Sequence, residues 1–295
     1  PILKSIREGL AGNKIEWVAG IINGTTNFIL TEMQEKGVTF AKALSEAQSL
    51  GYAEADPTFD IEGIDAAHKL TILAGLSFGI PMNFKDVYVE GIKALEQKDI
   101  QYAEELGYRI KLLGIAKSRD KGIELRVHPT LIPEKRLIAN VNGAMNAIVV
   151  KGNMVGPTLY YGAGAGALPT ASAVVADLID ISRSSHVPPH GFEDNKINSI
   201  PIYKIEDAIS GYYLRIRVSD KPGVLAEITK LFGDKKISID AMLQKESKEH
   251  ESEADIVILS HLAVEKDINT VILTIESLSA TIGKVIKIRL EELSK

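Results

Sequence analysis

The most constraining feature of this chain is an acidic segment, residues 51–69, that separates two apolar runs with helical spacing. It holds five carboxylic acids and a single lysine. Pro57 and Gly63 interrupt regular structure, because proline fixes φ and glycine opens backbone conformations that other residues avoid. Asp65 can cap or open the following helix, where its carboxylate can accept hydrogen bonds from free N–H groups. Lys69 lies one helical turn further on, so the two side chains share a face.

A charged pair beside such a turn has two interpretations. Flanked by further carboxylates and aimed by a helix, it can bind a small charged metabolite and move a proton. Alternatively, the segment is a solvated acidic loop with an ordinary surface ion pair, which contributes little. Spacing alone slightly favours the second interpretation.

Length and composition exclude several classes of function. A chain of 295 residues can hold two domains with their own cores. The net charge of -5 and the lack of a basic run argue against general nucleic-acid binding. The absence of cysteine excludes disulfides and thiolate metal sites, and the six histidines are scattered, so no metal site is expected. No apolar run approaches membrane-spanning length, and we expect a cytoplasmic protein without a membrane partner.

Residues 1–183 are predicted to form one unit of mixed secondary structure. Apolar spacing and β-branched runs predict helices at 2–10, 25–35, 39–50, 65–77, 99–106 and 169–183, and strands at 15–22, 87–92, 109–118, 123–133 and 146–151. This mixture indicates an α/β or α+β domain in which helices pack on a mixed sheet.

A second unit is expected over residues 211–295, behind a linker at 184–210 where Pro188-Pro189-His190-Gly191 breaks regular structure. Strands are predicted at 212–218, 237–244, 255–261 and 285–289, and helices at 223–232 and 268–278. This βαββαβ order is that of a ferredoxin-like fold.

Four segments resemble those of homoserine dehydrogenases. The family pattern G-Y-x-E-x-D-P-x-x-D-x-x-G-x-D-x-x-x-K is met at every fixed position from Gly51 to Lys69. Asn23-Gly24-Thr25-Thr26-Asn27 resembles the family's first substrate segment, and residues 87–92 and 162–177 also match. Residues 218–226 resemble the opening of an ACT domain, a regulatory module that often binds amino acids.

The resemblance implies a dehydrogenase that interconverts aspartate semialdehyde and homoserine with NADP or NAD, in the biosynthesis of threonine, methionine and isoleucine. It implies that Lys69 is the catalytic lysine and that Asp65 orients it. An ammonium beside the reacting carbonyl stabilises the developing charge and can donate the proton. Desolvation would lower the pKa of this lysine from about 10.4 and Asp65 would raise it, so the sequence leaves the balance open.

The substrate contacts implied by the resemblance lie in two segments. Glu54 is our choice for the substrate ammonium, and the other expected contacts are Gly24, Thr25, Tyr52 and Asp60. Each has a plainer alternative: Tyr52 can simply pack, and Gly24 with Thr25 can form a strand-to-helix turn in which Thr25 is the cap.

The glycine run Gly162-Ala163-Gly164-Ala165-Gly166 is expected to precede the helix near Pro169. It is not a Rossmann fingerprint, because no strand–turn–helix unit surrounds it. Glycine spacing alone usually marks a close-packed turn, but the resemblance implies that Gly162, Gly164 and Gly166 touch the cofactor. Ala163 stands where many relatives have arginine or proline, which puts a charged contact there in doubt.

We expect the chain to be a piece of a longer enzyme. Residues 1–3 resemble the family's join from a nucleotide-binding Rossmann domain, and residues 162–183 resemble the segment that returns to it. The helix over 171–181 should then expose an apolar patch. Residues 1–295 alone should have negligible dehydrogenase activity, because the sequence contains no Rossmann fingerprint.

In the ACT unit the resemblance implies an amino-acid effector, threonine in this family. Pro222 and Gly223 shape a turn whose N–H groups can face a carboxylate, and Asp220 or Asp240 could accept from the ammonium. The turn could instead be purely structural. ACT units usually pair edge to edge, so we expect at least a homodimer.

The alternative for the whole chain is a non-catalytic amino-acid-binding regulatory fragment. The joint presence of Glu54, Asp60, Asp65 and Lys69 favours the enzyme, because a sensor has no need of a proton donor.

Overall fold

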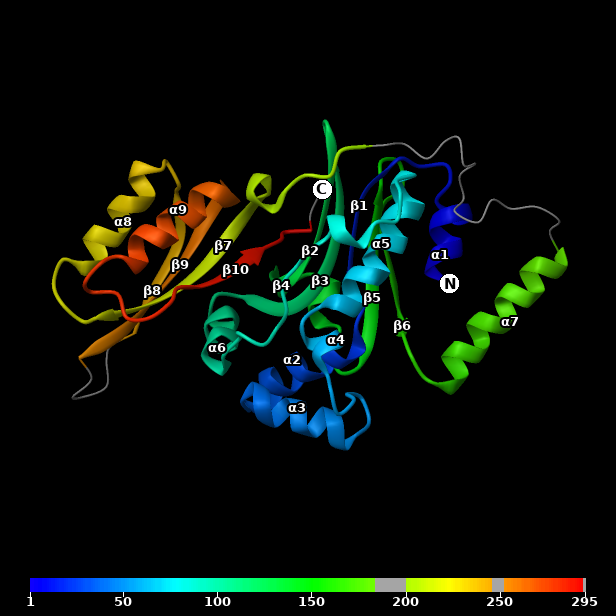
Figure 1. Cartoon of the computed structure of the whole chain (residues 1–295), viewed down its shortest axis with the longest axis horizontal. Coiled ribbons are helices and arrows are strands. Elements are labelled where there is room, and N and C mark those ends of the chain that lie inside the picture. Colours follow the sequence, from blue (N-terminus) through cyan, green and yellow to red (C-terminus); the bar gives the residue numbers. More distant parts are fainter. Residues whose placement is uncertain (184–199, 246–251, 294–295) are drawn as a thin grey trace.

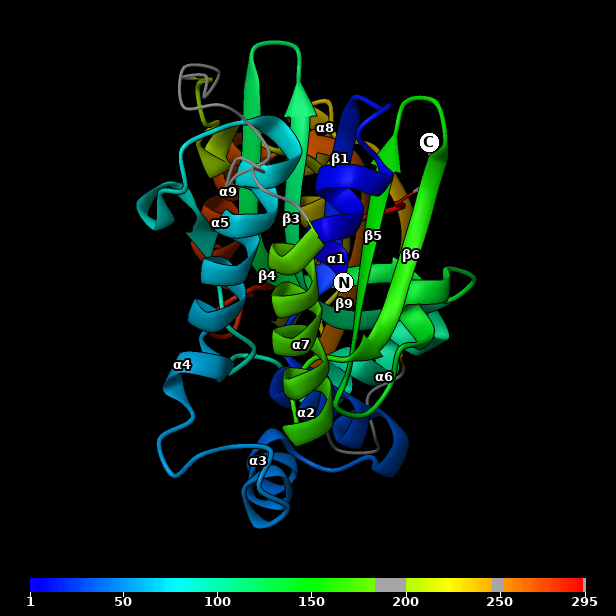
Figure 2. The ribbon, with the colours of Figure 1, turned by 90° about the vertical axis from the view of Figure 1, so that its right-hand side faces the viewer.

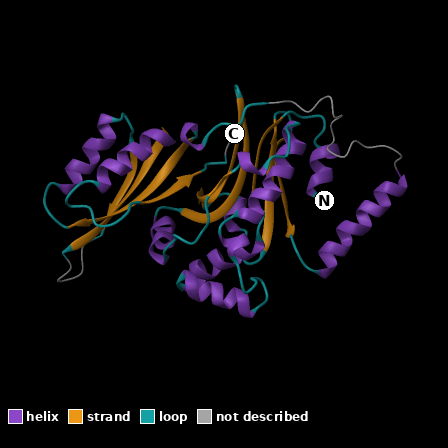
Figure 3. Ribbon diagram, viewed as in Figure 1, coloured by secondary structure: helices purple, strands orange, loops and turns teal. Residues whose placement is uncertain are grey.

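The computed structural model describes residues 1–183, 200–245 and 252–293 (Figure 1). Its strands form one ten-stranded sheet in the order β6-β5-β1-β3-β4-β10-β7-β9-β8, with β2 paired to β4 beside this path. Helices and strands are mixed throughout, as Figure 3 shows, which confirms the expected α/β class.

The first unit contributes the strands from β6 to β4. Its strands are β1 (Ile15–Ile21), β2 (Tyr88–Val89), β3 (Tyr108–Arg119), β4 (Gly122–Pro133), β5 (Met145–Gly152) and β6 (Gly156–Ala163). Its helices are α1 (Ile2–Lys4), which continues as a π-helical turn (Ser5–Gly9), α2 (Gly24–Lys36), α3 (Phe40–Ser49), α4 (Thr58–Ile61), α5 (Ile64–Phe78), α6 (Gln97–Glu105) and α7 (Ala167–Arg183).

Two of these elements were not predicted, and one strand is shorter than predicted. Helix α4 is a single turn inside the acidic segment, and the strand expected over 87–92 is only β2. Strand β6 has a proline at its second residue, which is tolerated because β6 lies at the edge of the sheet. The prediction that Gly162 lies in a loop was therefore wrong, because this residue pairs with Asn146 of β5.

Helices α2, α5 and α6 pack on one face of the first unit's strands. Their apolar faces and the sheet share a core in which Val18, Leu70 and Ala116 have no exposed surface. Such burial is the main favourable term in folding, at about 25 cal/mol per Å² of apolar surface. The helices are thereby fixed against the strand ends from which the candidate site is built.

Helix α7 lies at one end of the molecule, beside α1 (Figures 1 and 2). It has no buried residue, and Asp180 ties it to the chain through ion pairs with Lys4 and Arg7. The exposed apolar patch expected over residues 171–181 is present, and its large members are Val174, Val175, Leu178, Ile179 and Ile181. No helix in the described part of the chain is long and apolar enough to cross a membrane.

The second unit has the predicted βαββαβ order. Its elements are β7 (Ile209–Ser219), α8 (Val224–Asp234), β8 (Ile239–Gln244), β9 (Glu253–Val264), α9 (Glu265–Glu276) and β10 (Ile286–Leu290). Helices α8 and α9 lie side by side on one face of its strands (Figure 1), above a core that includes Ile228, Phe232 and Ile268.

The two units are joined through strand β4. On the edge opposite β3, β4 pairs in parallel with β10, with Arg289 beside Thr130. The same edge pairs with β2 further back along the strand. Ile202 also forms a parallel bridge to Ile123 at the start of β4. The described end of the expected linker is therefore bound to the first unit, while residues 184–199, including Pro188 to Gly191, lie outside the described residues.

Lys111 is a buried cation of the first unit whose hydrogen bonds go to neutral groups. Its Nζ donates to Val141 O at 2.7 Å, Asn142 Oδ1 at 3.1 Å and Asn27 Oδ1 at 3.3 Å. Burial lowers the pKa of Lys111 to about 8. The lysine thus fastens α2 to the segment before β5 at an electrostatic cost.

This cost predicts a pH-dependent difference between wild type and Lys111→Met. Between pH 8 and 10.5 the unfolded chain keeps a proton on this lysine that the folded protein has released, so wild-type stability rises with pH. From pH 8 to 10.5 the unfolding free energy of wild type should rise relative to that of the variant by up to about 3 kcal/mol, at 1.36 kcal/mol per pH unit. Urea unfolding of both proteins at several pH values measures it, and a constant difference would contradict the prediction.

Candidate active site

A polar cluster forms where β1 ends and α2, α4 and α5 meet. Asn23 follows β1 and caps α2, because its Oδ1 accepts from Thr26 N at 2.8 Å. Its Nδ2 donates to Asp60 Oδ1 at 2.7 Å and to Asp65 Oδ2 at 2.9 Å. One amide therefore binds two carboxylates at once, although their like charges repel each other. Asn23 begins the segment 23–27 quoted in the sequence analysis, but its role was not predicted because its partners lie 37 and 42 residues away.

Lys69 belongs to the same cluster. Its Nζ donates to Asp65 Oδ2 at 2.7 Å and to Ile22 O at 3.2 Å, so the expected shared face of α5 is present. An ammonium has three N–H donors, and the described residues take two of them. The lysine side chain is 49% exposed, against 20% for Asp65. The ammonium is thus held from behind by a carboxylate and a carbonyl, with one donor left for a ligand.

The loop before α4 is tied to the start of α2. Thr25 Oγ1 donates to Tyr52 O at 2.6 Å, and the Tyr52 ring packs on Phe28 with centroids 4.9 Å apart. The alternative that Thr25 caps α2 was wrong, since Asn23 is the cap. Glu54 is exposed, and its backbone oxygen accepts from Gln48 Nε2 at 3.1 Å. Among the predicted substrate residues, Asp60 is in the Lys69 cluster, whereas Glu54 stands on the neighbouring loop.

Gly24 is required by the close approach of another backbone segment. A Cβ atom at this position would lie 2.7 Å from Ala144 O, which is part of the chain just before β5. Because that oxygen belongs to the backbone, it cannot turn aside as a flexible side chain would. The glycine therefore fits α2 against the β5 side of the sheet.

The glycine run lies across β5 from this cluster. Gly164 passes so close to Asn146 that a Cβ there would be 2.2 Å from Nδ2, and Gly166 has φ +119 just before α7. Asn146 Oδ1 is buried and has no hydrogen-bond partner among the residues that the structure describes, and it faces Gly24. Gly162 and Gly164, but not Gly166, line a cavity of about 380 Å³ together with Asn146, Tyr161 and Thr170. Asn146, which no sequence signal indicated, thus stands between the two segments that the sequence analysis selected.

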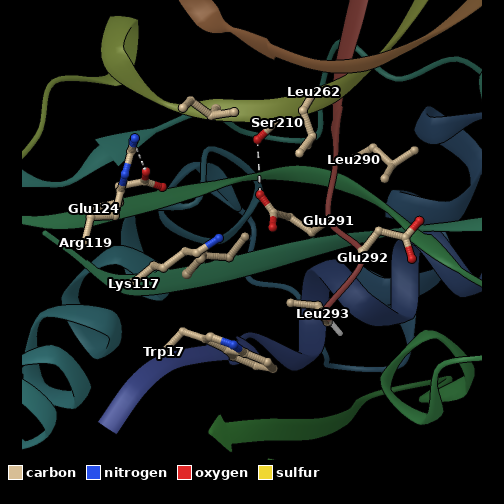
Figure 4. Close-up of a pocket in the computed structure, with 12 residues that line it drawn as sticks. Trp17, Lys117, Arg119, Glu124, Ser210, Leu262, Leu290, Glu291, Glu292 and Leu293 are labelled. Carbon is tan, nitrogen blue, oxygen red and sulfur yellow. Dashed lines mark hydrogen bonds and ion pairs between the residues drawn. The ribbon is translucent and has the colours of Figure 1, made fainter. Parts of the chain in front are cut away.

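Another cavity, of about 490 Å³, lies between the first unit's sheet and the second unit (Figure 4). Lys117 and Glu291 point into it, above Trp17. None of its lining residues comes from the acidic segment or the glycine run. We therefore place the candidate active site at the Lys69 cluster, where the proton-moving groups are.

Of the candidate effector residues of the second unit, Asp240 lies apart from the turn that holds Asp220, Pro222 and Gly223. Gly223 has φ +94 and begins α8, and Asp220 follows the last residue of β7. Asp240 lies on β8 next to the residue paired with Ser260, at the opposite end of the sheet from Asp220. Its carboxylate lies 3.5 Å from His261 Nε2. Within one chain Asp240 therefore lies far from the turn at residues 220–223, and its role as the alternative acceptor for the ligand ammonium stays a prediction for a contact between subunits.

A lysine–carboxylate cluster on a mixed α/β unit, joined to a separate βαββαβ unit, is typical of an enzyme that carries an additional small domain. Residues 1–179 match the family model "Homoserine dehydrogenase", and residues 212–280 match the model "ACT domain". The chain belongs to the homoserine dehydrogenase family, NAD(P)-dependent oxidoreductases that interconvert aspartate semialdehyde and homoserine.

Relatives and solved structures agree with this assignment. The homoserine dehydrogenase of Pseudomonas aeruginosa is 54% identical over 300 residues, which span 100% of this chain and 69% of that protein. A homoserine dehydrogenase structure from Thiobacillus denitrificans matches with a TM-score of 0.94 and 60% identity, covering 100% of this chain and 68% of that one. A mutant hyperthermophilic archaeal homoserine dehydrogenase in complex with NADPH matches with a TM-score of 0.52 and 31% identity, covering 62% and 52%.

The close approach at Gly24 predicts the effect of adding one methyl group. Gly24→Ala should lower the free energy of unfolding by about 1–3 kcal/mol, the usual cost of overpacking a rigid site. Gly12→Ala is the matched control, because a Cβ at Gly12 meets nothing within 4 Å. Urea unfolding of both variants measures the difference, and equal stabilities would contradict the argument.

Proposed function

We propose that Lys69 is the catalytic acid and base for the interconversion of aspartate semialdehyde and homoserine, with Asp65 as the residue that orients it. The observation that carries this proposal is the ammonium held by Asp65 and Ile22 O, with one donor left over, beside Asn23 and Asp60. An ordinary surface ion pair would have no use for the second carboxylate or for the buried amide that joins them. The alternative of a non-catalytic regulatory fragment leaves this cluster unexplained.

The substrate carries an ammonium, a carboxylate and the reacting carbonyl or hydroxyl group. Asp60 and Glu54 supply negative charge for the ammonium, and Tyr52 borders the same loop. Gly24 and Thr25 open α2, where backbone N–H groups and the helix dipole favour a carboxylate. These contacts would place the carbonyl oxygen toward the Lys69 ammonium.

The NADP or NAD cofactor supplies or accepts the hydride when bound. Lys69 gives a proton to the carbonyl oxygen as negative charge develops there, and removes it from the hydroxyl in the reverse direction. Asp65 keeps the ammonium directed at that oxygen and stabilises its charged form. Asn23 fixes the positions of Asp60 and Asp65 by donating to both, so that one binds substrate while the other holds the lysine.

We assign Gly162, Gly164 and Gly166 to cofactor binding. The cavity is lined by Gly162, Gly164 and Asn146, whose buried oxygen has no donor among the described residues, so this lining fits a flat polar ring such as nicotinamide. The archaeal relative in complex with NADPH supports NADP as one possibility, and NAD is the other. The exposed apolar patch of α7 would contact the part of the enzyme that holds the nucleotide.

We propose three parts for the chain: a catalytic unit over residues 1–183, a linker over 184–210 and an ACT regulatory unit over 211–295. Threonine is the proposed effector, at the turn formed by Asp220, Pro222 and Gly223 before α8. The β10 edge of the ACT strands is occupied by β4, whereas β8 ends the described sheet. Edge-to-edge pairing in a homodimer or larger oligomer would therefore use β8.

Substitution of the lysine tests the catalytic proposal. In the complete enzyme, Lys69→Ala should lower kcat by roughly 10²–10⁴-fold and remove one limb of the pH–rate profile. Glu54→Ala and Asp60→Ala should act mainly on KM for homoserine, if they hold ground and transition states equally. Lys85→Ala, at an exposed lysine, is the control and should keep normal kcat. A Lys69→Ala enzyme with near-normal kcat would remove this residue from the mechanism.

Calorimetric titration tests the effector proposal. Threonine should release or absorb heat on binding and raise the melting temperature at millimolar concentration, with isoleucine and methionine as comparison ligands. Gly223→Ala should weaken that binding, since φ +94 disfavours a residue with a side chain. If none of the three amino acids gives heat or a shift in melting temperature, the ACT unit serves assembly alone.

A further inference from the structure

A buried charge cluster joins the ACT unit to the catalytic unit at the edge of β4. Arg289 of β10 is 1% exposed, and its guanidinium forms two hydrogen bonds with Glu265, at 2.9 Å from Nε and 2.6 Å from Nη2. Its Nη1 donates to Glu90 Oε2 at 2.8 Å, and Nη2 donates to Tyr88 Oη at 3.2 Å. One arginine thus binds a carboxylate from each unit.

The cluster is internally paired. Tyr88 Oη donates to Glu90 Oε2 at 2.9 Å, and burial raises the pKa of Tyr88 to about 12, so the hydroxyl keeps its proton. Burial acts to raise the pKa of Glu265, but its hydrogen bonds with Arg289 hold that pKa below its ordinary value. A bidentate arginine–carboxylate pair of this kind has a fixed geometry. The backbone of Glu90 is held by β4, through Glu90 N and Val127 O at 2.8 Å, and its carboxylate is held by Arg289 of the ACT unit.

The two residues that follow Glu90 contact the α4–α5 turn of the candidate active site. Gly91 crosses the α4–α5 turn so closely that a Cβ there would lie 2.4 Å from Ile61 O and 2.6 Å from Glu62 Cα. Ile92 N donates to the same Ile61 O at 2.9 Å. Asp60 is the residue directly before Ile61.

Two carboxylates of the site flank the α4–α5 turn. Asp60 lies near the end of α4, Asp65 lies in the first turn of α5, and both accept hydrogen bonds from Asn23. Because Gly91 leaves no space for a Cβ beside Ile61 and Glu62, and Ile92 N bonds Ile61 O, a shift of the segment after β2 moves the turn with it. The path from Arg289 to Asp60 therefore consists of one ion pair and two backbone contacts.

We propose that Glu90 is a positioning residue for homoserine binding and that Arg289 of the ACT unit sets its place. This inference rests on the assignment of Asp60 and Asp65 to the substrate site. A shift of the ACT unit that draws Arg289 away would displace Glu90, and with it the turn that presents both carboxylates. The ACT unit would thereby control substrate affinity without contacting substrate.

The test uses the complete enzyme with Glu90→Gln and Arg289→Lys. Glu90→Gln keeps the size of the side chain, and Arg289→Lys keeps a positive charge beside Glu265 but loses the guanidinium fork that joins Glu265 to Glu90. Each should raise KM for homoserine roughly 5- to 50-fold, because small misplacements of binding groups are costly, while KM for NADP or NAD stays within about two-fold of wild type. The double variant should lose less than the product of the two single effects, since both act on one contact.

Glu105→Gln is the matched control. Glu105 of α6 also pairs with the ACT unit, through Lys245, but this exposed pair does not lead to the α4–α5 turn. Its homoserine KM should equal that of wild type. Melting temperatures report whether a variant is destabilised, and direct titration with homoserine reports whether its substrate affinity has changed.

Two results would overturn the inference: a homoserine KM for Glu90→Gln and Arg289→Lys no different from Glu105→Gln, or multiplicative effects in the double variant. If Lys69→Ala keeps normal kcat while Glu90→Gln still raises KM for homoserine, the catalytic proposal fails and the positional link survives. The two ideas are therefore tested separately.

Discussion

Strand β4 is the element on which the arrangement of both units depends. All of its residues are buried, and it pairs with β3 on one edge and with both β2 and β10 on the other. It also carries Glu124 and Arg126 into the interior, where each finds an opposite charge. Arg126 reaches Glu291, just beyond β10, at 2.6 Å. Because unpaired buried charges are costly, this pairing fixes the ACT unit against the catalytic sheet.

His128, also on β4, is a buried titratable residue that is kept uncharged by its surroundings. Burial, together with Arg289 and Arg126 nearby, holds the pKa of His128 well below its ordinary value. The imidazole is thus an uncharged partner of Arg126, at 3.1 Å, rather than a third cation. Each arginine instead pairs with carboxylates: Arg126 with Glu291, and Arg289 with Glu90 and Glu265.

The candidate site follows from the placement of elements around β4 and β1. Strand β2 holds the α4–α5 turn from one side, and Asn23 holds it from the other. The lysine and its carboxylate need only the helix between them, since they are one turn apart on α5. The cluster thus combines one local pair with groups brought in over long sequence distances.

The acidic segment, the helices around it and the βαββαβ order could be read from the sequence, because each depends on neighbours within one or two turns. The family could also be recognised, since its substrate pattern is contiguous from Gly51 to Lys69. Strand β6 could not be read, because Gly156 and Pro157 look like a turn until β5 supplies a partner. The separation of Asp240 from Asp220 likewise follows from the register of β8 on β9 and β9 on β7.

The sequence by itself determined the Asp65–Lys69 pair, the glycine-rich approach to α7 and the class of enzyme, since short-range spacing and pattern are enough for these. Only the tertiary structure decided that Asn23 joins Asp60 to Asp65, that Asn146 stands between Gly24 and Gly164, and that Arg289 reaches Glu90. These contacts span from 18 residues, between Asn146 and Gly164, to 199 residues, between Glu90 and Arg289. They arise from sheet order and strand register, which depend on packing of the whole molecule rather than on any local pattern.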